Sequence, residues 1–215
     1  MGVRKSPAEV RLDQNAEESI EPGSGFHIGF FGGVSLPMGK FAEVSDKASG
    51  FSITGWAVGV DGLVELDPHV DWISSLNLSV NRTDMGSLVT APNIHVSSTS
   101  WSNVWLLTGL RVNGPVVPGS PLKLFAQGQV GFLFGTSPAV NLDWGSGYSD
   151  QGSSSSQALG YSIGAGLAIE NFSVCVRYVG GNPSYNFTAT GSGGKVSGAF
   201  EQQTSCIEIA AGVGF

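Results

Sequence analysis

Apolar residues recur at every second position in eight segments of the chain, and this period of two is the feature that most restricts the fold. In one segment, for example, Trp56 and Val58 alternate with Ala57 and Gly59. Successive side chains of a β-strand point to opposite faces, whereas the face of an α-helix repeats about every 3.6 residues. We therefore predict eight β-strands, at residues 26–36, 52–66, 70–82, 101–113, 122–134, 159–170, 172–180 and 207–215.

The connections between these strands alternate between short and long. Short links at residues 67–69, 114–121 and 170–171 alternate with long polar links at residues 38–50, 83–100, 137–157 and 180–199. Outer-membrane barrels show this alternation, because tight turns face the periplasm and longer loops face the outside. The even number of strands returns both ends of the barrel to the periplasmic side.

The charged side chains of the strands are sorted onto one face. That face also carries the glycines, while the opposite face is almost free of charge. The charged residues are Asp61, Glu65, Asp71, Arg111, Lys123, Glu170, Arg177 and Glu208. A charge at the middle of a bilayer costs about 2–4 kcal/mol, so a charge-free apolar face is what contact with lipid predicts. A soluble barrel with the apolar face as its core is compatible with the same sorting, but the apolar face of every strand and the alternating loops favour lipid.

We therefore expect an all-β fold, an eight-stranded antiparallel up-and-down transmembrane β-barrel at residues 25–215. Residues 1–24 are charged and poor in aromatics, which predicts a disordered N-terminal tail without the apolar core of a signal peptide. No run of about 18 apolar residues is present, which excludes a transmembrane helix. The net charge of −7 argues against binding to nucleic acid, which requires clustered Lys and Arg.

The glycine-aromatic strands, the segment "LKLFAQGQVGF" after a Pro/Gly turn and the final strand ending in Phe215 resemble a known family. It is the family of small eight-stranded outer-membrane β-barrels of Gram-negative bacteria, which includes the OmpA membrane domain and OmpW. The resemblance covers residues 25–215. It implies an outer-membrane location, contact with the lipid bilayer and lipopolysaccharide, and a role for Phe215 as the signal read by the barrel-assembly machinery.

The interior of an eight-stranded barrel has room only for side chains, so charges there need partners. We expect Arg177 to pair with Glu208, and Arg111 or Lys123 to reach Asp61 or Glu65 across the interior. Such a network would close the lumen, so the protein is not expected to be a general porin.

The two cysteines fall on the lumen face of neighbouring strands. If the connecting hairpin is centred near residues 190–191, Cys175 and Cys206 lie opposite each other, within the disulfide range of about 4.4–6.8 Å between Cα atoms. A competing register aligns Phe172 with Phe215 and separates the cysteines by roughly six residues, or about 20 Å. A disulfide between Cys175 and Cys206 follows only from the first register.

The remaining motifs allow weaker predictions. The lumen aromatics Phe31, Trp101, Trp105 and Phe125 either pack the interior or line a passage for hydrophobic ligands, as the resemblance to OmpW implies. The sequence "HVS" at residues 95–97 is similar to the His-x-Ser of lipid A deacylases, but it falls in a predicted loop instead of a late strand. A chance occurrence is the preferred interpretation. No metal site and no cofactor are expected.

The sequence therefore supports one main function and two alternatives. The main hypothesis is a non-enzymatic outer-membrane barrel with a closed polar lumen and a structural, adhesive or assembly role. A protein partner would bind through the long extracellular loops or the N-terminal tail. The first alternative is a transporter of small hydrophobic molecules, and the more remote one is a lipid-modifying enzyme.

Overall fold

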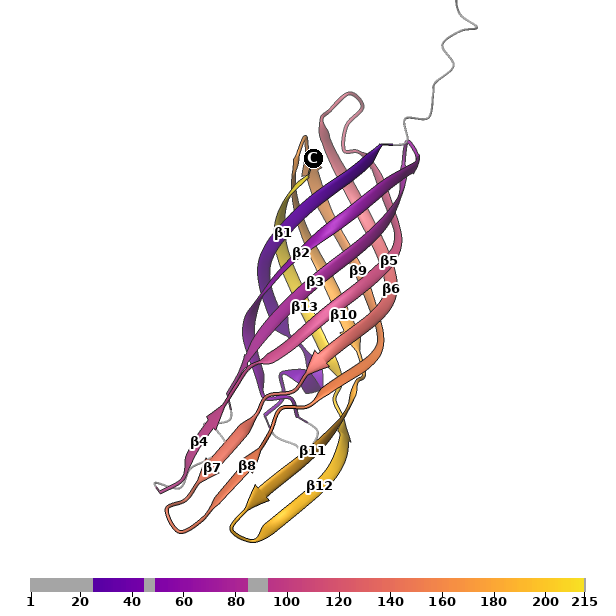
Figure 1. Cartoon of the computed structure of the whole chain (residues 1–215). Coiled ribbons are helices and arrows are strands. Elements are labelled where there is room, and N and C mark those ends of the chain that lie inside the picture. The colour runs from indigo at the N-terminus through magenta and orange to yellow at the C-terminus, as the bar shows by residue number, and fades with distance from the viewer. Residues whose placement is uncertain (1–24, 45–48, 85–92, 215) are drawn as a thin grey trace, which may run out of the picture.

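Eight long strands close into an antiparallel barrel (Figure 1). The computed structural model describes residues 25–44, 49–84 and 93–214, so the predictions for residues 1–24 and for Phe215 lie outside the described residues. The barrel strands are β1 (Phe26–Pro37), β2 (Ser52–Asp67), β3 (Val70–Thr83), β5 (Trp101–Pro115), β6 (Leu122–Thr136), β9 (Ser155–Ile169), β10 (Phe172–Gly181) and β13 (Thr204–Gly214). Their order around the barrel is β1-β13-β10-β9-β6-β5-β3-β2. The predicted eight-stranded antiparallel barrel is confirmed.

The long connections lie at one end of the barrel and the tight turns at the other. β2 and β3 are joined through Pro68 and His69, and β9 and β10 through Glu170 and Asn171. The start of β1 and the end of β13 lie at the same end as these turns (Figure 1). This end corresponds to the periplasmic side of an outer-membrane barrel, and we call the opposite end the outer end.

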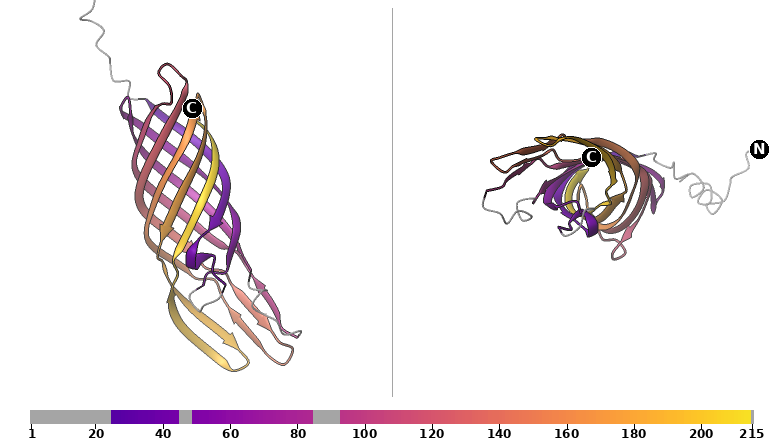
Figure 2. Two further views of the ribbon diagram at one scale, coloured as in Figure 1. Left: turned by 180° about the vertical axis from the view of Figure 1, so that it is seen from behind. Right: turned by 90° about the horizontal axis from the view of Figure 1, so that it is seen from below.

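The long connections form a second β-sheet at the outer end, which we call the outer sheet (Figure 2). Its strands are β4 (His95–Ser98), β7 (Val140–Asp143), β8 (Tyr148–Gln151), β11 (Ser184–Gly191) and β12 (Gly194–Glu201), in the order β12-β11-β8-β7-β4. A short 3-10 helix, η1 (Gly39–Phe41), lies in the connection between β1 and β2. Strands thus occupy parts of three of the four links that the sequence predicts to be long and polar. The segment at residues 191–194 contains the two-residue turn that joins β11 to β12.

Apolar side chains cover the outward face of the barrel. Leu76 on β3 is 52% exposed, Val130 on β6 is 66% exposed and Ile163 on β9 is 66% exposed. The interior, in contrast, buries polar residues such as Ser79 and Asn103. A soluble barrel would have the opposite distribution, so this surface is suited to lipid and not to water. No helix formed by the described residues is long and apolar enough to cross a membrane.

An aromatic cluster lies in the interior of the barrel toward the outer end. Trp101, Trp105 and Leu133 form a buried cluster there with Phe41 from η1 and Tyr185 from β11. Trp101 lies between the other two rings, with its ring centroid 5.5 Å from that of Phe41 and 5.5 Å from that of Tyr185, both edge to face. Aromatic side chains therefore close the outer end of the lumen, and buried polar residues such as Asn81, which pairs with Trp101 in the register of β3 and β5, lie at the same level.

Candidate functional site

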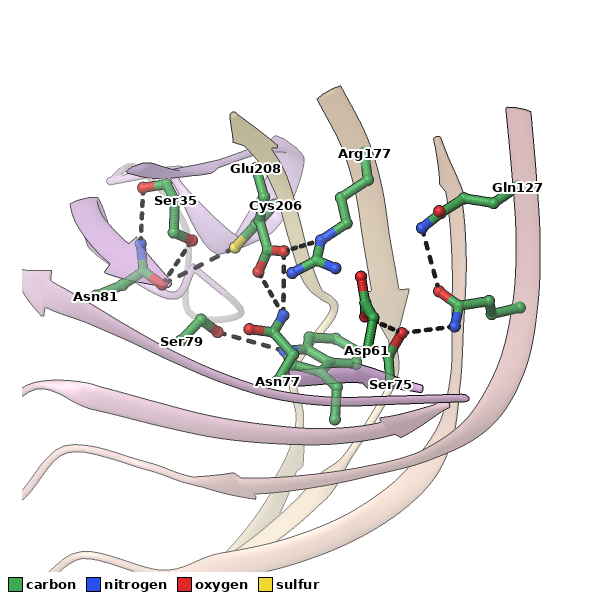
Figure 3. Close-up of polar contacts among 12 residues, drawn as sticks. Ser35, Asp61, Ser75, Asn77, Ser79, Asn81, Gln127, Arg177, Cys206 and Glu208 are labelled. Carbon is green, nitrogen blue, oxygen red and sulfur yellow. Dashed lines mark hydrogen bonds and ion pairs between the residues drawn. The ribbon is translucent and has the colours of Figure 1, made fainter. Parts of the chain in front are cut away.

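A buried ion pair lies at the centre of the lumen. Arg177 on β10 and Glu208 on β13 face each other in the strand register, and Arg177 Nε lies 2.5 Å from Glu208 Oε2. Asn77 Nδ2, from β3 on the other side of the lumen, donates to both carboxylate oxygens at 2.9 and 3.0 Å. The Arg177 guanidinium also lies 4.0 Å from the centroid of the Phe31 ring. The structure thus places together the two residues that the sequence paired, with the Asn77 amide beside them (Figure 3). The Phe31 ring adds an aromatic face.

A second charged group lies closer to the periplasmic end. Arg111 Nη2 is 3.8 Å from Asp61 Oδ2, and Arg111 donates to Gln127 Oε1 at 3.1 and 2.8 Å. Asp61 also accepts a hydrogen bond of 2.6 Å from the Ser75 hydroxyl, which in turn accepts one of 2.7 Å from Gln129. Polar side chains from the neighbouring strands β2, β3, β5 and β6 are therefore linked, and Figure 3 shows the part of this group that includes Asp61, Ser75 and Gln127.

The other four predicted lumen charges lie at the periplasmic mouth. Glu65, Asp71, Lys123 and Glu170 line a cavity of about 320 Å³ that opens at this end. Asp71 accepts a hydrogen bond of 2.8 Å from Asn113. The eight charges are thus not one network, because four of them lie in the two groups around the arginines and four surround the entrance.

Two glycines make room for the rings that contact the arginines. A Cβ atom at Gly59 would lie 2.3 Å from Cζ of Phe31, and one at Gly166 would lie 2.5 Å from Cζ of Phe125. Phe125 lies under the Arg111 guanidinium, with 4.3 Å between the guanidinium carbon and the ring centroid. Each glycine is the direct partner of its ring on the neighbouring strand, so the glycine-rich lumen face leaves room for large side chains from adjacent strands to fill the interior.

Comparisons with known proteins agree with this architecture. No protein-family model matches the sequence, and no curated protein is significantly similar to it. A major outer membrane protein from Thermus thermophilus is 14% identical, with a TM-score of 0.51, over 89% of this chain and 100% of that chain. The chain has the fold of an outer-membrane β-barrel. Ail, the attachment invasion locus protein of Yersinia pestis, is 13% identical with a TM-score of 0.49, over 89% of this chain and 99% of that chain.

The predicted disulfide of the barrel is wrong. β10 and β13 align Phe172 with Val213, which places Cys175 opposite Ala210 and Cys206 opposite Val179. Cys175 is thus four positions along the ladder from Cys206, or about 13 Å at the rise of a β-strand. Both cysteines are free. The connecting hairpin is centred at Ser192 and Gly193, between the paired residues Gly191 and Gly194, and not near residues 190–191.

Polar residues without charge complete the lumen, and the sequence did not single them out. Asn81 donates to the carbonyl oxygen of Ser35 and accepts from its hydroxyl, both at 3.2 Å. Trp105 donates to the Ser79 hydroxyl at 3.3 Å. Their position was the available signal. These polar residues lie on the same face as the charges, and along each strand they alternate with the apolar residues of the opposite face. Among the lumen aromatics, Trp101, Trp105 and Phe125 are buried and pack the interior.

The outer sheet does not assemble a catalytic group among its described residues. His95 lies opposite Asp143 in the register of β4 and β7, and Ser97 lies two residues further along β4. No hydrogen bond joins these three described side chains, and the Asp143 carboxylate instead accepts one of 2.8 Å from the amide of Gly145. Within residues 25–44, 49–84 and 93–214 no cluster of His, Cys, Asp and Glu could hold a metal ion.

Proposed function

We propose that the protein is a non-enzymatic β-barrel of the bacterial outer membrane with a closed lumen and an adhesive role. The outer sheet is the part that binds protein partners. One observation carries the proposal: the outer sheet ends in β12, an eight-residue strand that pairs with β11 on one side and forms the end of the sheet on the other. Such an edge presents free backbone donors and acceptors to another chain.

The register of the hairpin identifies the backbone groups at this edge. A two-residue turn makes Gly191 and Gly194 the closing pair, so alternate residues of β12 bond to β11. The amides of Lys195, Ser197 and Ala199 then point to the open edge. Proteins usually protect an edge strand with prolines, bulges or several charges. β12 is exposed along most of its length, and its only charges are Lys195 and Glu201, near its two ends.

The partner that fits this edge is an extended polypeptide. A strand added to β12 would gain main-chain hydrogen bonds, and its side chains would contact the alternate positions of β12. The exposed face of β12 offers Val196, which is 64% exposed. The N-terminal tail, which lies outside the described residues, is the other segment that the sequence proposed for partner binding.

The apolar outer surface supports the location. Exposed aliphatic and aromatic side chains surround the barrel, including Trp56 and Trp72. They would contact lipid tails in the bilayer and lipopolysaccharide in the outer leaflet. Assembly by the barrel-assembly machinery through Phe215 is part of the same proposal.

Transport of small hydrophobic molecules through the lumen has less support. The Arg177–Glu208 pair and the buried rings of Trp101 and Trp105 lie between the periplasmic mouth and the outer end. A molecule entering from either end would have to displace them.

Two variants of one residue test the adhesive role. Ser197→Pro removes an amide that points to the open edge and leaves the bonds to β11 in place, whereas Ser197→Ala keeps that amide. Bacteria that display each variant are compared for adherence to other cells and to an array of immobilised proteins. Ser197→Pro is expected to reduce adherence at least tenfold, and Ser197→Ala to preserve it.

Removal of the whole β11–β12 hairpin tests the adhesive role without relying on the choice of Ser197. Replacing residues 184–201 with a short glycine turn removes β11 and β12 and leaves the barrel strands intact. The proposal is wrong if this shortened barrel, at equal surface levels, adheres as well as the unmodified protein, or if the unmodified protein adheres no better than bacteria without it.

A further inference from the structure

A second cavity lies where the outer sheet meets the barrel. Its volume is about 320 Å³, within the usual range for small-molecule pockets. The cavity is lined by Ser49, Gly50, Phe51, Trp101, Ser137, Pro138, Val140, Gln151, Phe187 and Phe200. None of these ten residues is charged. The lining comes from the β1–β2 connection, the start of β5, the β6–β7 connection and four strands of the outer sheet.

Four aromatic rings dominate this lining, and contacts within the protein hold them in place. Trp101 Nε1 donates to the carbonyl oxygen of Gly50 at 2.7 Å. The ring of Phe200 stacks on that of Tyr185, with centroids 5.5 Å apart, and contacts that of Phe187 at 6.1 Å. Because these walls are fixed by internal contacts, a ligand would not have to order them on binding.

The Phe51 ring is presented by a strained backbone. Phe51 has φ of 50°, in the left-handed region that residues with a Cβ rarely adopt. Two hydrogen bonds hold this conformation, one from the Phe51 amide to the Glu43 carbonyl at 3.2 Å and one from the Asp84 amide to the Phe51 carbonyl at 2.8 Å. Strain of this kind is concentrated at functional sites.

Gly50, the residue before Phe51, has no room for a side chain. A Cβ atom at Gly50 would lie 2.6 Å from the carbonyl oxygen of Phe41. The pair Gly50–Phe51 thus combines a close backbone approach with a strained conformation, and both features direct the Phe51 ring to the cavity that Trp101 also lines.

We infer that this cavity is a binding site for a small uncharged aromatic molecule. The rings of Phe51, Trp101 and Phe187 favour offset or edge-to-face contacts with a flat ligand. The absence of charged groups among the ten lining residues disfavours an ionised ligand, because its charge would be desolvated without a partner. The side-chain amide of Gln151 can bond to one polar group of the ligand.

Binding at this site does not require passage through the barrel. Trp101 lines the cavity and also belongs to the buried cluster with Phe41 and Tyr185 at the outer end of the lumen. A ligand therefore enters from the outer end and leaves by the same route. The inference is independent of the adhesive role, because it concerns the base of the outer sheet and not the open edge of β12.

An NMR titration with indole as the probe tests the inference. The full-length protein is placed in lipid nanodiscs with ¹⁵N-labelled tryptophan, and indole N–H shifts are followed. Trp101 lines the cavity, whereas Trp56 is 48% exposed on the outward face and reports partitioning of indole into lipid. The Trp101 shift is expected to saturate with indole concentration, and the Trp56 shift to rise linearly without saturation.

Two substitutions link the saturating signal to the cavity. Val140→Phe adds volume inside the cavity, while Val196→Phe makes the same change on β12, outside the cavity lining. Val140→Phe is expected to weaken indole affinity at least tenfold, and Val196→Phe to leave it within twofold. Gln151→Phe provides the same test if Val140→Phe does not fold. The inference is overturned if the Trp101 shift rises linearly with indole concentration, like that of Trp56. It is also overturned if a substitution that fills the cavity leaves the affinity for indole unchanged.

Discussion

At the scale of single residues, the lumen shows how two arginines are kept charged inside a barrel. Each arginine lies in a group with a carboxylate, an amide side chain and an aromatic ring: the group of Arg177 contains Glu208, Asn77 and Phe31. Side chains of Arg177 and Glu208 are only 3% and 0% exposed. Removing one partner of such a pair leaves a buried charge without compensation, which costs more than the intact pair contributes.

Arg177→Ala is therefore expected to lower the free energy of unfolding by about 3–5 kcal/mol. Lys123→Ala, at the exposed periplasmic mouth, should change it by less than about 0.5 kcal/mol. Urea unfolding of the two variants in lipid vesicles measures both values. Adding Glu208→Gln to Arg177→Ala removes the remaining charge and should restore part of the loss. Equal stability of Arg177→Ala and Lys123→Ala would contradict the role of the pair.

The sequence could predict the Arg177–Glu208 pairing but not the contribution of Asn77. Arg177 and Glu208 lie on strands that are adjacent in the chain order of the barrel, so their shared face and similar depth can be read from the alternation. Asn77 reaches the carboxylate from β3, on the opposite side of the lumen. That contact depends on the curvature of the closed barrel, which a local pattern does not contain.

At the scale of elements, strand register decides which side chains meet. Val179 and Cys206 are direct partners on β10 and β13, whereas Cys175 faces Ala210. Direct partners in an antiparallel pair have Cα atoms about 4.5–5.5 Å apart, within disulfide range. In a Cys175→Ser background, Val179→Cys is therefore expected to form a disulfide with Cys206 on oxidation.

Mass spectrometry of the oxidised protein without reductant measures this cross-link. The unmodified protein is the matched control, because it also carries two cysteines on the same strands, and it should keep two free thiols. A Cys175–Cys206 bond in the unmodified protein would show that the register of β10 and β13 is different.

Three of the five outer-sheet strands that the sequence did not predict are short and polar. The eight barrel strands have 10 to 16 residues each, long enough for a period of two to be recognised. β4, β7 and β8 have four residues each and contain mainly Ser, Asn, Asp and other small or polar residues. The pairing of β4 with β7 and of β8 with β11 depends on the barrel bringing three separate connections together, and this long-range effect has no local signature.

At the scale of the whole molecule, the barrel has two surfaces of opposite character. Trp56 and Trp72 are 48% and 44% exposed on the outward face, whereas Trp101 and Trp105 are 3% and 0% exposed in the interior. This sorting predicts which tryptophans contact lipid. Brominated lipids quench tryptophan fluorescence only at close range, so they distinguish the two sets.

Variants that retain one tryptophan each, with the others replaced by Phe, provide the measurement. In vesicles of brominated lipid, fluorescence from Trp56 and Trp72 is expected to be strongly quenched, while that from Trp105 should remain close to its value in ordinary lipid. Strong quenching of Trp105 together with weak quenching of Trp56 would mean that the faces of the barrel are reversed.

The closed interior makes a prediction about the molecule as a whole. Ions entering at the periplasmic mouth would first meet the Arg111–Asp61 group and then the buried Arg177–Glu208 pair. Beyond these charges lie Trp105, Leu133 and Tyr185, each with 0% exposure. An eight-stranded barrel has no spare width around such side chains, so a continuous water-filled path is not expected.

Recordings in planar bilayers test this prediction directly. The purified protein is expected to give no stable, large conductance steps, whereas a sixteen-stranded porin measured in the same bilayer should give them. Arg177→Ala should also give none, because the apolar cluster of Trp105, Leu133 and Tyr185 still blocks the outer half of the lumen when the ion pair is lost. Large steps from the unmodified protein would show that the interior opens. Large steps from Arg177→Ala alone would show that the ion pair, and not the aromatic cluster, is the barrier to ions.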